Sequence, residues 1–270
     1  MLKDITLGQY FPGNSFIHRL DPRSKLLMVV VYIAVIFLIQ NFVGYGILAA
    51  FTLLFVLCSK VPLTFIAKGV KPILFFICIT ALFNLFLTGG RELVHFSFLT
   101  ITYEGLNIAI FMVLRLLFLV FGTSVLTLTT SPIALTDGLE HLLSPLSKIR
   151  FPAHELAMMM TIALRFIPTL LEETDKIIKA QSARGADFES GNIIRRAKAM
   201  VPILIPLFIS AFRRADDLAT AMECRCYRGG EGRTHLKQLK FGKVDIWGWG
   251  WMTLFFLLIL TANFYFGKAI

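Results

Sequence analysis

Two arginines near the ends of two amphipathic stretches carry the chemistry that this sequence indicates most clearly. A guanidinium binds a carboxylate through two parallel hydrogen bonds, which fixes the geometry as well as adding energy. Small residues beside such an arginine let a helix end approach another protein closely. The two motifs, whose arginines are 41 residues apart, are Ala183-Arg184-Gly185 and Cys224-Arg225-Cys226. This pattern indicates docking into pockets on a partner.

Helix capping is the simpler interpretation of each arginine. A cation near a helix C-terminus interacts favourably with the helix dipole, by about 0.3–1 kcal/mol, and glycine is common just after a helix. Capping alone explains a single Arg-Gly helix end. Because one segment carries two such ends, at Arg184 and Arg225, we favour two similar pockets on a dimeric partner.

The elements that carry these arginines belong to a chain that is mostly apolar. Hydrophobic residues make up 56% of the 270 residues, including 26 Phe, whereas soluble domains are about 45–50% apolar. A transmembrane helix needs about 20 apolar residues. The sequence therefore predicts an all-α polytopic membrane protein with about five transmembrane helices, at roughly 25–40, 43–59, 70–88, 106–130 and 246–266.

The spans divide the chain into three predicted parts. Residues 1–130 hold an N-terminal cytosolic tail and the first four spans, and residues 245–270 hold the last span. Between them, residues 131–244 form a cytosolic insert whose two long helices end in the two arginine motifs. The insert is predicted to begin with a short helix at about 133–145, after Ser131-Pro132.

Two long amphipathic helices follow in the insert, because apolar residues recur there at spacings of three and four. The first is predicted to end at Gly185, and the second to continue to Tyr227 and stop at Gly229-Gly230, since position 226 is not glycine. We expect the two helices to cross and pack, with their apolar first halves at or in the inner leaflet. Their apolar stripes are Leu156, Met160, Ala163, Ile167, Leu170, Ile177 and Ile178, and Val201, Leu204, Phe208, Ala211, Ala215, Leu218 and Met222.

Positive charge is concentrated on one predicted side of the membrane. Of the 27 Lys and Arg, 24 lie in the N-terminal tail, in the segment from Lys60 to Lys71, or in the insert. Basic loops remain in the cytoplasm. We therefore predict a cell-membrane protein with a cytoplasmic N-terminus and an extracellular C-terminus. The same distribution argues against nucleic acid as a partner, despite the net charge of +10.

Other clusters offer little chemistry. Cys224 and Cys226 have no second cysteine pair nearby, so we predict no metal site, and we predict no cofactor and no catalytic residue. The sequence has no phosphate-binding loop of the Walker A type, so ATP would bind elsewhere. Arg115 lies within a predicted span, near mid-bilayer. A structural role and a contact with substrate or another subunit are both open for it.

Four stretches resemble the T component of energy-coupling factor (ECF) transporters, the family that also contains cobalt-type transport permeases. They are His18-Arg19-Leu20-Asp21-Pro22-Arg23-Ser24-Lys25, Ala163-Leu164-Arg165-Phe166-Ile167-Pro168, Gln181-Ser182-Ala183-Arg184-Gly185, and Arg213–Ala219 with Ala221–Gly230. The resemblance covers nearly the whole chain.

The resemblance implies a scaffold subunit of an ATP-driven importer of a vitamin or another micronutrient. Two ATPase subunits, similar but not necessarily identical, would lie beneath it, and a separate small membrane protein, the S component, would bind the substrate. Arg184 and Arg225 would end two coupling helices and insert into one groove on each ATPase. Movement of these helices would make the S component topple in the bilayer. The chain itself would not be an enzyme.

Alternatives remain at the level of function and of the second motif. A polytopic membrane enzyme would use Asp216, Asp217, Glu172 and His154 of the insert. A permease of another ATP-driven class would carry the substrate path itself. Many members of the resembled family have Ala-Arg-Gly or Val-Arg-Gly where this chain has cysteines around Arg225. We expect docking to be retained there, with a redox or metal role for the thiols as the alternative.

Overall fold

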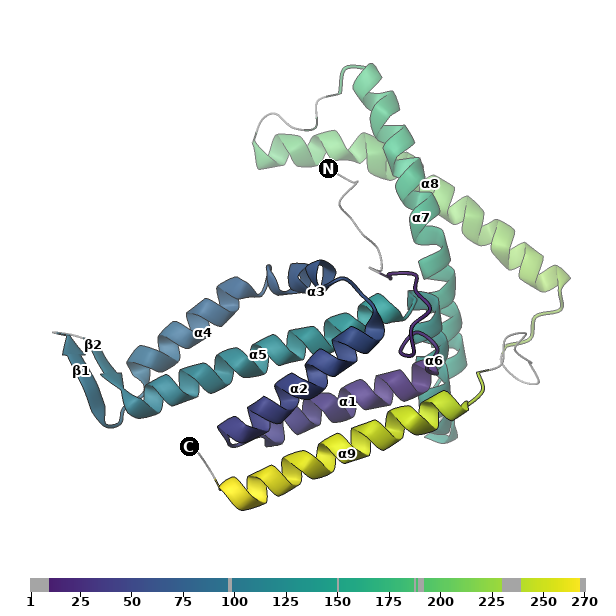
Figure 1. Cartoon of the computed structure of the whole chain (residues 1–270). Coiled ribbons are helices and arrows are strands. Elements are labelled where there is room, and N and C mark those ends of the chain that lie inside the picture. Colours follow the sequence, from purple (N-terminus) through teal and green to yellow (C-terminus); the bar gives the residue numbers. More distant parts are fainter. Residues whose placement is uncertain are drawn as a thin grey trace. The chain divides into compact units, whose positions relative to one another are not determined.

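The structure is a computed structural model and describes residues 10–96, 99–149, 151–186, 188, 192–229 and 239–267. Helices make up most of the described chain, and one short β-hairpin joins two of them (Figure 1). Contacts divide the chain into two units. The span unit comprises Gly8–Leu142 and Gln238–Ile270, and the crossed-helix unit comprises the described part of Leu143–Lys237. All five predicted spans belong to the span unit.

Four of the predicted spans are single helices. They are α1 (Pro22–Leu38), α2 (Phe42–Ser59), α5 (Tyr103–Thr129) and α9 (Lys243–Phe266). Each end lies within three residues of its predicted position. Helices α2, α5 and α9 are long and apolar enough to cross a membrane, and α1, with 17 residues, reaches the lower limit for a span. The predicted all-α membrane fold is confirmed.

The remaining span, predicted as one helix at 70–88, is broken. Helices α3 (Leu63–Val70) and α4 (Leu74–Leu87) are bent by 54° where they meet. Pro72 lies at the break, where it lacks a backbone N–H and its ring clashes with the preceding turn. The 14 residues of α4 measure about 21 Å, less than the hydrocarbon core of about 30 Å. The α3–α4 pair together is therefore the fifth candidate span.

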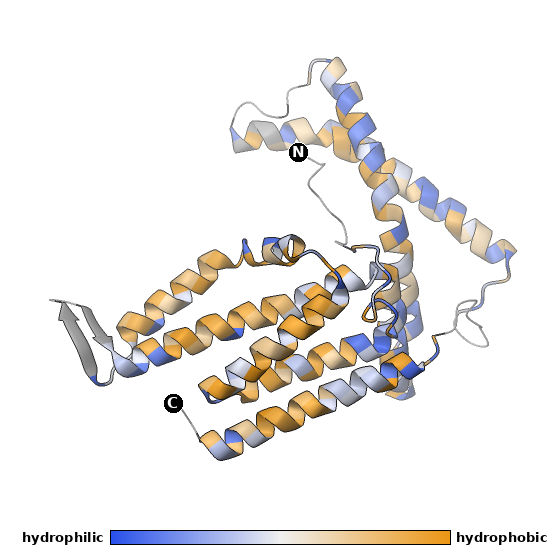
Figure 2. Cartoon of the chain, viewed as in Figure 1, coloured by the Kyte–Doolittle hydropathy of each residue, from blue (hydrophilic) through white to orange (hydrophobic). Residues whose placement is uncertain are grey.

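Four helices meet in the core of the span unit, where α1 and α2 each pack against α5 and α9. Ile36 and Phe255 are buried in this core. The Tyr32 hydroxyl shares a 2.9 Å hydrogen bond with the Thr52 hydroxyl and donates to the Phe118 carbonyl at 3.1 Å. Hydrophobic residues predominate along these helices (Figure 2), and many of their large hydrophobic side chains are exposed. A unit that is apolar inside and outside suits a lipid environment.

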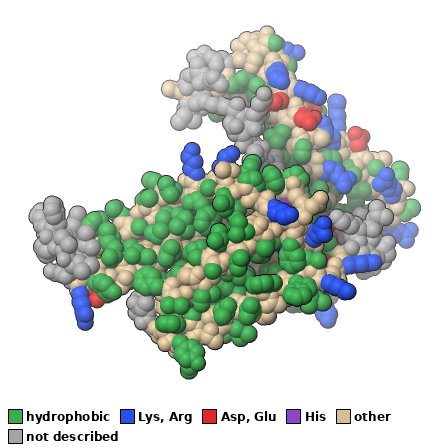
Figure 3. All heavy atoms as spheres, in the orientation of Figure 1, with side chains coloured by type: hydrophobic (Ala, Val, Ile, Leu, Met, Phe, Trp, Pro, Cys, Tyr) green, Lys and Arg blue, Asp and Glu red, His purple; other side chains and the backbone are tan. Residues whose placement is uncertain are grey.

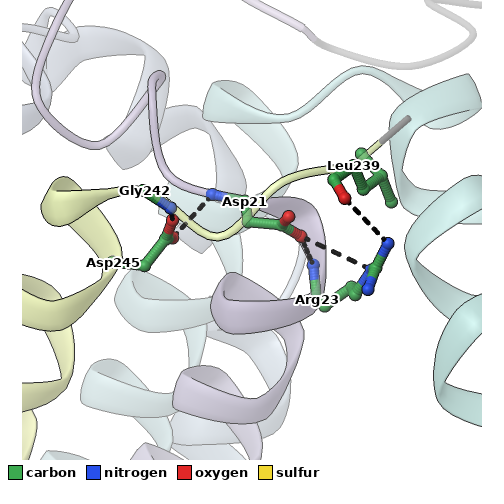
Figure 4. A network of polar contacts seen from close by, with 5 residues as sticks. All are labelled: Asp21, Arg23, Leu239, Gly242 and Asp245. Atoms are coloured by element: carbon green, nitrogen blue, oxygen red, sulfur yellow. Dashed lines mark hydrogen bonds and ion pairs between the residues drawn. The ribbon is translucent and has the colours of Figure 1, made fainter. Parts of the chain in front are cut away.

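The polar motif before the first span fastens α1 to α9 (Figure 4). The Asp245 carboxylate accepts from the backbone N–H groups of Asp21 and Gly242, each at 2.8 Å. Asp21 caps α1 by accepting from the Arg23 N–H at 2.9 Å, and Arg23 Nη2 donates to the Leu239 carbonyl at 3.3 Å. This clasp joins residues that are 224 positions apart. Its two aspartates are buried.

Further hydrogen bonds bring the same end of the span unit together with α5. Lys25 is buried, and its Nζ donates to the Thr129 carbonyl and the Thr130 hydroxyl, both at 3.1 Å. The first turns of α1 and α9 and the last turn of α5 therefore lie at one end of the helices. At the opposite end, Asn41 Nδ2 donates to the Ala262 carbonyl at 3.0 Å. Helix α9 is thus fastened at both of its ends.

A β-hairpin between α4 and α5 was not predicted from the sequence. Strands β1 (Glu92–Phe96) and β2 (Leu99–Thr102) pair antiparallel. Thr102 then begins α5, because its hydroxyl accepts from the Gly105 N–H at 3.1 Å and donates to the Thr88 carbonyl at 2.7 Å. The hairpin lies at the end of the span unit opposite to the clasp, as Figure 1 shows.

The short predicted helix is α6 (Pro132–Leu143), followed by the 3-10 helix η2 (Ser144–Ile149). Helix α6 packs with the spans, since a Cβ at Gly138 would lie 3.1 Å from Pro22 and 3.3 Å from Leu26. The division between the two units consequently falls after Leu142. The division of the chain by topology at residues 131 and 244 stays a prediction.

Candidate docking site

The two long helices of the insert cross each other in the crossed-helix unit (Figure 1). They are α7 (Ala153–Ala183) and α8 (Ile193–Cys224). Arg214 of α8 donates through Nη2 to Glu173 Oε2 of α7 at 2.7 Å. A hydrogen bond with Ser210 and the charge of Arg214 lower the pKa of Glu173. The predicted crossed pair is confirmed, and this ion pair marks one point of the crossing.

Helix α7 is also long and apolar enough to cross a membrane. Its charge pattern distinguishes its two halves. The segment 172–179 holds five charged residues within about two turns, and charges within the hydrocarbon core are costly. The second half of α7, which leads to Arg184, is therefore expected outside that core.

Most of the apolar stripe in the first half of α8 is not covered by α7. Within the described part of the crossed-helix unit, the buried hydrophobic residues are Ala153, Ala157 and Ile203. Leu204 is 43% exposed and Phe208 is 60% exposed. The helices touch where they cross, so each leaves an apolar face open. Large exposed apolar surfaces indicate contact with a membrane or a partner.

Arg184 is the residue at which α7 ends. The Gly185 N–H donates to the Ser182 carbonyl and the Ala186 N–H to the Gln181 carbonyl, both at 3.0 Å. These two bonds form a Schellman motif, with Gly185 in the left-handed region at φ 87°. Glycine adopts that φ without steric cost. The predicted stop at Gly185 is confirmed.

Arg225 ends α8 with the same backbone pattern. The Cys226 N–H donates to the Glu223 carbonyl at 2.8 Å and the Tyr227 N–H to the Met222 carbonyl at 3.0 Å. Cys226 takes the place of glycine and adopts φ 56°. The prediction that α8 continues to Tyr227 is wrong, because the motif closes around a cysteine in the left-handed conformation.

The two arginines have closely matching local geometry. Arg184 has φ −87° and ψ 5°, and Arg225 has φ −91° and ψ 11°. Both residues are exposed, as are the small residues beside them. Neither guanidinium forms an ion pair with a carboxylate in the described parts of the chain. Each tip therefore presents an exposed guanidinium at a helix end that a Schellman motif closes.

A groove of about 680 Å³ adjoins the second tip. Arg225 and Arg228 line it from the end of α8, and Arg165 lines it from α7. Of these three arginines, only Arg225 was predicted from the sequence, because Arg165 is 60 positions away and approaches it only where α7 and α8 cross. The occurrence of Arg165 in one of the four matching stretches was the available signal.

The residues proposed for an enzyme do not form a cluster. Glu172, Asp216 and Asp217 are exposed on their helices. Across the described ranges, no three His, Cys, Asp or Glu side chains are grouped as they would be around a metal ion. Cys224 and Cys226 are exposed free thiols. This arrangement gives a membrane enzyme no support.

Arg115 lies within α5 and contacts the last turn of α1. Its guanidinium carbon is 5.2 Å from the centroid of the Phe37 ring, and its side chain also interacts with Tyr45. The Nε atom is buried and has no hydrogen-bond partner among the described residues. Both interpretations of Arg115 therefore stay open.

The fold and the site define a polytopic helical membrane protein with a separate unit of two crossed helices. The family described as CbiQ, cobalt transport protein, matches residues 13–236. The chain belongs to this family. It also aligns with proteins named energy-coupling factor transporter transmembrane protein EcfT.

Three of these relatives show how complete the similarity is. The protein of Clostridium kluyveri is 62% identical over 247 residues, which is 91% of this chain and 92% of the relative. The protein of Ruminiclostridium cellulolyticum is 55% identical over 98% of this chain and all of the relative. The protein of Bacillus subtilis is 46% identical over the full length of both chains.

Proposed function

We propose that this chain is the transmembrane scaffold subunit of an ECF-type, ATP-driven importer of a vitamin or another micronutrient. It couples ATP hydrolysis by two partner ATPases to movement of a substrate-binding S component. Membership of the CbiQ family and the similarity to EcfT proteins support the transporter class. The ATPases bind ATP, so the scaffold needs no cofactor and is not an enzyme.

The observation that carries this proposal is the pair of matching arginine tips. The Schellman motif fixes the backbone at each tip, so Arg184 and Arg225 are presented in the same local conformation. A guanidinium is a planar fork that matches a carboxylate, so little entropy is lost for each hydrogen bond when it binds one bidentately. Two such tips suit one pocket on each of two similar ATPases. Ala183, Gly185, Cys224 and Cys226 leave room for close approach.

The contacts between the helices indicate how movement of the ATPases reaches the membrane. When the two ATPases close or open, the docked tips move with them. Helices α7 and α8 are held together at their crossing by Arg214 and Glu173, so each transmits displacement to the other. The exposed apolar face of α8 around Phe208 then acts on the S component or on the inner leaflet.

The distribution of charge supports a cytoplasmic location for both tips and for the N-terminus in the cell membrane. Within the span unit, Lys and Arg gather where α1 and α9 begin and are sparse along the membrane-spanning helices (Figure 3). Lys25 and Arg23 lie at this end, with Lys243 at the start of α9. By the positive-inside rule this end faces the cytoplasm, and the chain after α9 leaves on the outside.

Uptake of substrate tests the proposal. The complex carrying Arg184→Glu together with Arg225→Glu should lose ATP-dependent uptake in proteoliposomes, because two carboxylate pockets would then face glutamates. Lys179→Glu and Arg213→Glu are the controls, since both residues are exposed on the same helices. Uptake at the control level in the double variant would contradict the proposal.

A further inference from the structure

The groove beside Arg225 makes the second tip more than a single arginine. We propose that this groove receives an acidic segment of the ATPase that docks there, and that Arg165 and Arg228 bind its carboxylates together with Arg225. This inference rests on the proposed function. It goes further in naming two additional binding residues and the chemistry of the partner segment.

Two separate elements form the walls of the groove. Residues 158–166 of α7 contribute one wall, and residues 218–229 at the end of α8 and beyond contribute the other. The volume of about 680 Å³ lies within the range of about 300–1,000 Å³ that is usual for binding pockets. The groove therefore exists only where α7 and α8 lie against each other.

The charge of the groove indicates the charge of its occupant. Arg165, Arg225 and Arg228 line the groove, and no Asp or Glu is among the described residues that line it. Arginine remains protonated under all ordinary conditions. Three guanidinium groups around one groove repel one another until an anion enters. An occupant with two or more carboxylates accepts charge-assisted hydrogen bonds from these guanidinium groups.

The floor of the groove indicates that the occupant is a polypeptide. Ile162, Phe166, Leu218 and Met222 supply apolar surface among the arginines. A small inorganic anion would leave this surface exposed to water. A segment with an apolar side chain between acidic residues would bury it while its carboxylates reach the guanidinium groups.

Affinity measurements test the roles of the two additional arginines. Arg165→Gln and Arg228→Gln should each weaken binding of the α8-side ATPase about 10-fold, the effect of losing one hydrogen bond to a charged group, and should leave the other ATPase bound. Arg213→Gln, an exposed change on α8, should have no effect. Binding is measured with the purified full chain in nanodiscs and the separate ATPases.

The outcomes separate this inference from the proposed function. If Arg225→Glu releases the ATPase while Arg165→Gln and Arg228→Gln bind it as the wild type does, the additional arginines are not binding residues and the inference is wrong. If Arg225→Glu also has no effect, the proposed docking fails as well.

A photo-cross-linker identifies the occupant directly. Thr161 lines the groove without being an arginine, and a benzoylphenylalanine at this position in the assembled complex should cross-link to an Asp- or Glu-containing ATPase peptide. Cross-links to lipid, or to an ATPase peptide without acidic residues, would overturn the inference. The same substitution at exposed Thr220 of α8, which lies outside the groove, is the control.

Discussion

At the scale of single residues, Cys226 shows how the second tip is built. Its left-handed φ of 56° costs a residue with a Cβ about 1–2 kcal/mol relative to the right-handed form. The strain is tolerated because the Cys226 and Tyr227 N–H groups both bond to the last turn of α8. These bonds are also what fixes Arg225. The backbone conformation does not require a cysteine at position 226, because glycine adopts the same left-handed φ without strain.

Replacing Cys226 by glycine should therefore stabilise the end of α8. We expect the local opening free energy of the Cys226 and Tyr227 amides to rise by about 1 kcal/mol, because the left-handed conformation no longer strains a Cβ. Hydrogen exchange of the full chain in detergent measures this change. Cys224→Ala, at a helical position, should leave these amides unchanged. Faster exchange in Cys226→Gly would show that the cysteine side chain stabilises the turn.

The sequence allowed both arginines and the Gly185 stop to be predicted, since Arg-Gly at a helix end has a simple physical cause. It did not allow the Cys226 stop to be predicted, because a residue with a Cβ seldom adopts positive φ. The groove around Arg225 also escaped prediction. Its third arginine, Arg165, joins the others only through tertiary packing.

At the scale of helices and strands, the clasp joins the first turn of α1 to the first turn of α9. The chain that comes from α8 enters α9 at this end. The Asp245 carboxylate accepts from two backbone N–H groups, those of buried Asp21 and exposed Gly242. Arg23 holds the Leu239 carbonyl just before α9 begins. The chain leading to α9 is therefore anchored before it enters the bilayer.

Removal of the Asp245 carboxylate tests the importance of this clasp. Asp245→Ala leaves the buried Asp21 N–H without its acceptor, and an unsatisfied buried donor costs about 1–3 kcal/mol. We expect a lower midpoint of thermal unfolding in detergent. Asp217→Ala, at an exposed position on α8, is the matched control. An unchanged midpoint would mean that the clasp contributes little to stability.

The helices were predicted more accurately than their interruptions. Long apolar runs place α1, α2, α5 and α9 within three residues of their observed ends. The break at Pro72 and the hairpin at residues 92–102 were missed. Both lie in apolar or mixed sequence. Hydropathy alone does not distinguish a bent helix from a straight one there, and it does not distinguish a short strand from a helix.

At the scale of the whole molecule, the arrangement of charge distinguishes the two ends of the span unit. Basic residues gather at the clasp end of the span unit, while Arg91 lies near the opposite end, beside the hairpin. The second half of α7 carries charges of both signs. This asymmetry supports the proposed orientation, with the clasp and the arginine tips in the cytoplasm.

Labelling of cysteines in intact cells tests this orientation. A variant that carries Arg91→Cys and lacks the four native cysteines should react with a membrane-impermeant maleimide added outside. A variant that keeps only Cys224, which is exposed, should react only after the membrane is permeabilised. Equal expression of both variants is the control. The opposite labelling pattern would invert the topology and remove the tips from the cytoplasm.

The number of ATPases bound per scaffold tests the central claim most directly. The scaffold is captured from detergent-solubilised membranes, and the ATPases are counted by native mass spectrometry. We predict two for the wild type, one for Arg184→Glu or Arg225→Glu, and none for the double variant, because each tip holds one ATPase. Two ATPases on the double variant would contradict the account.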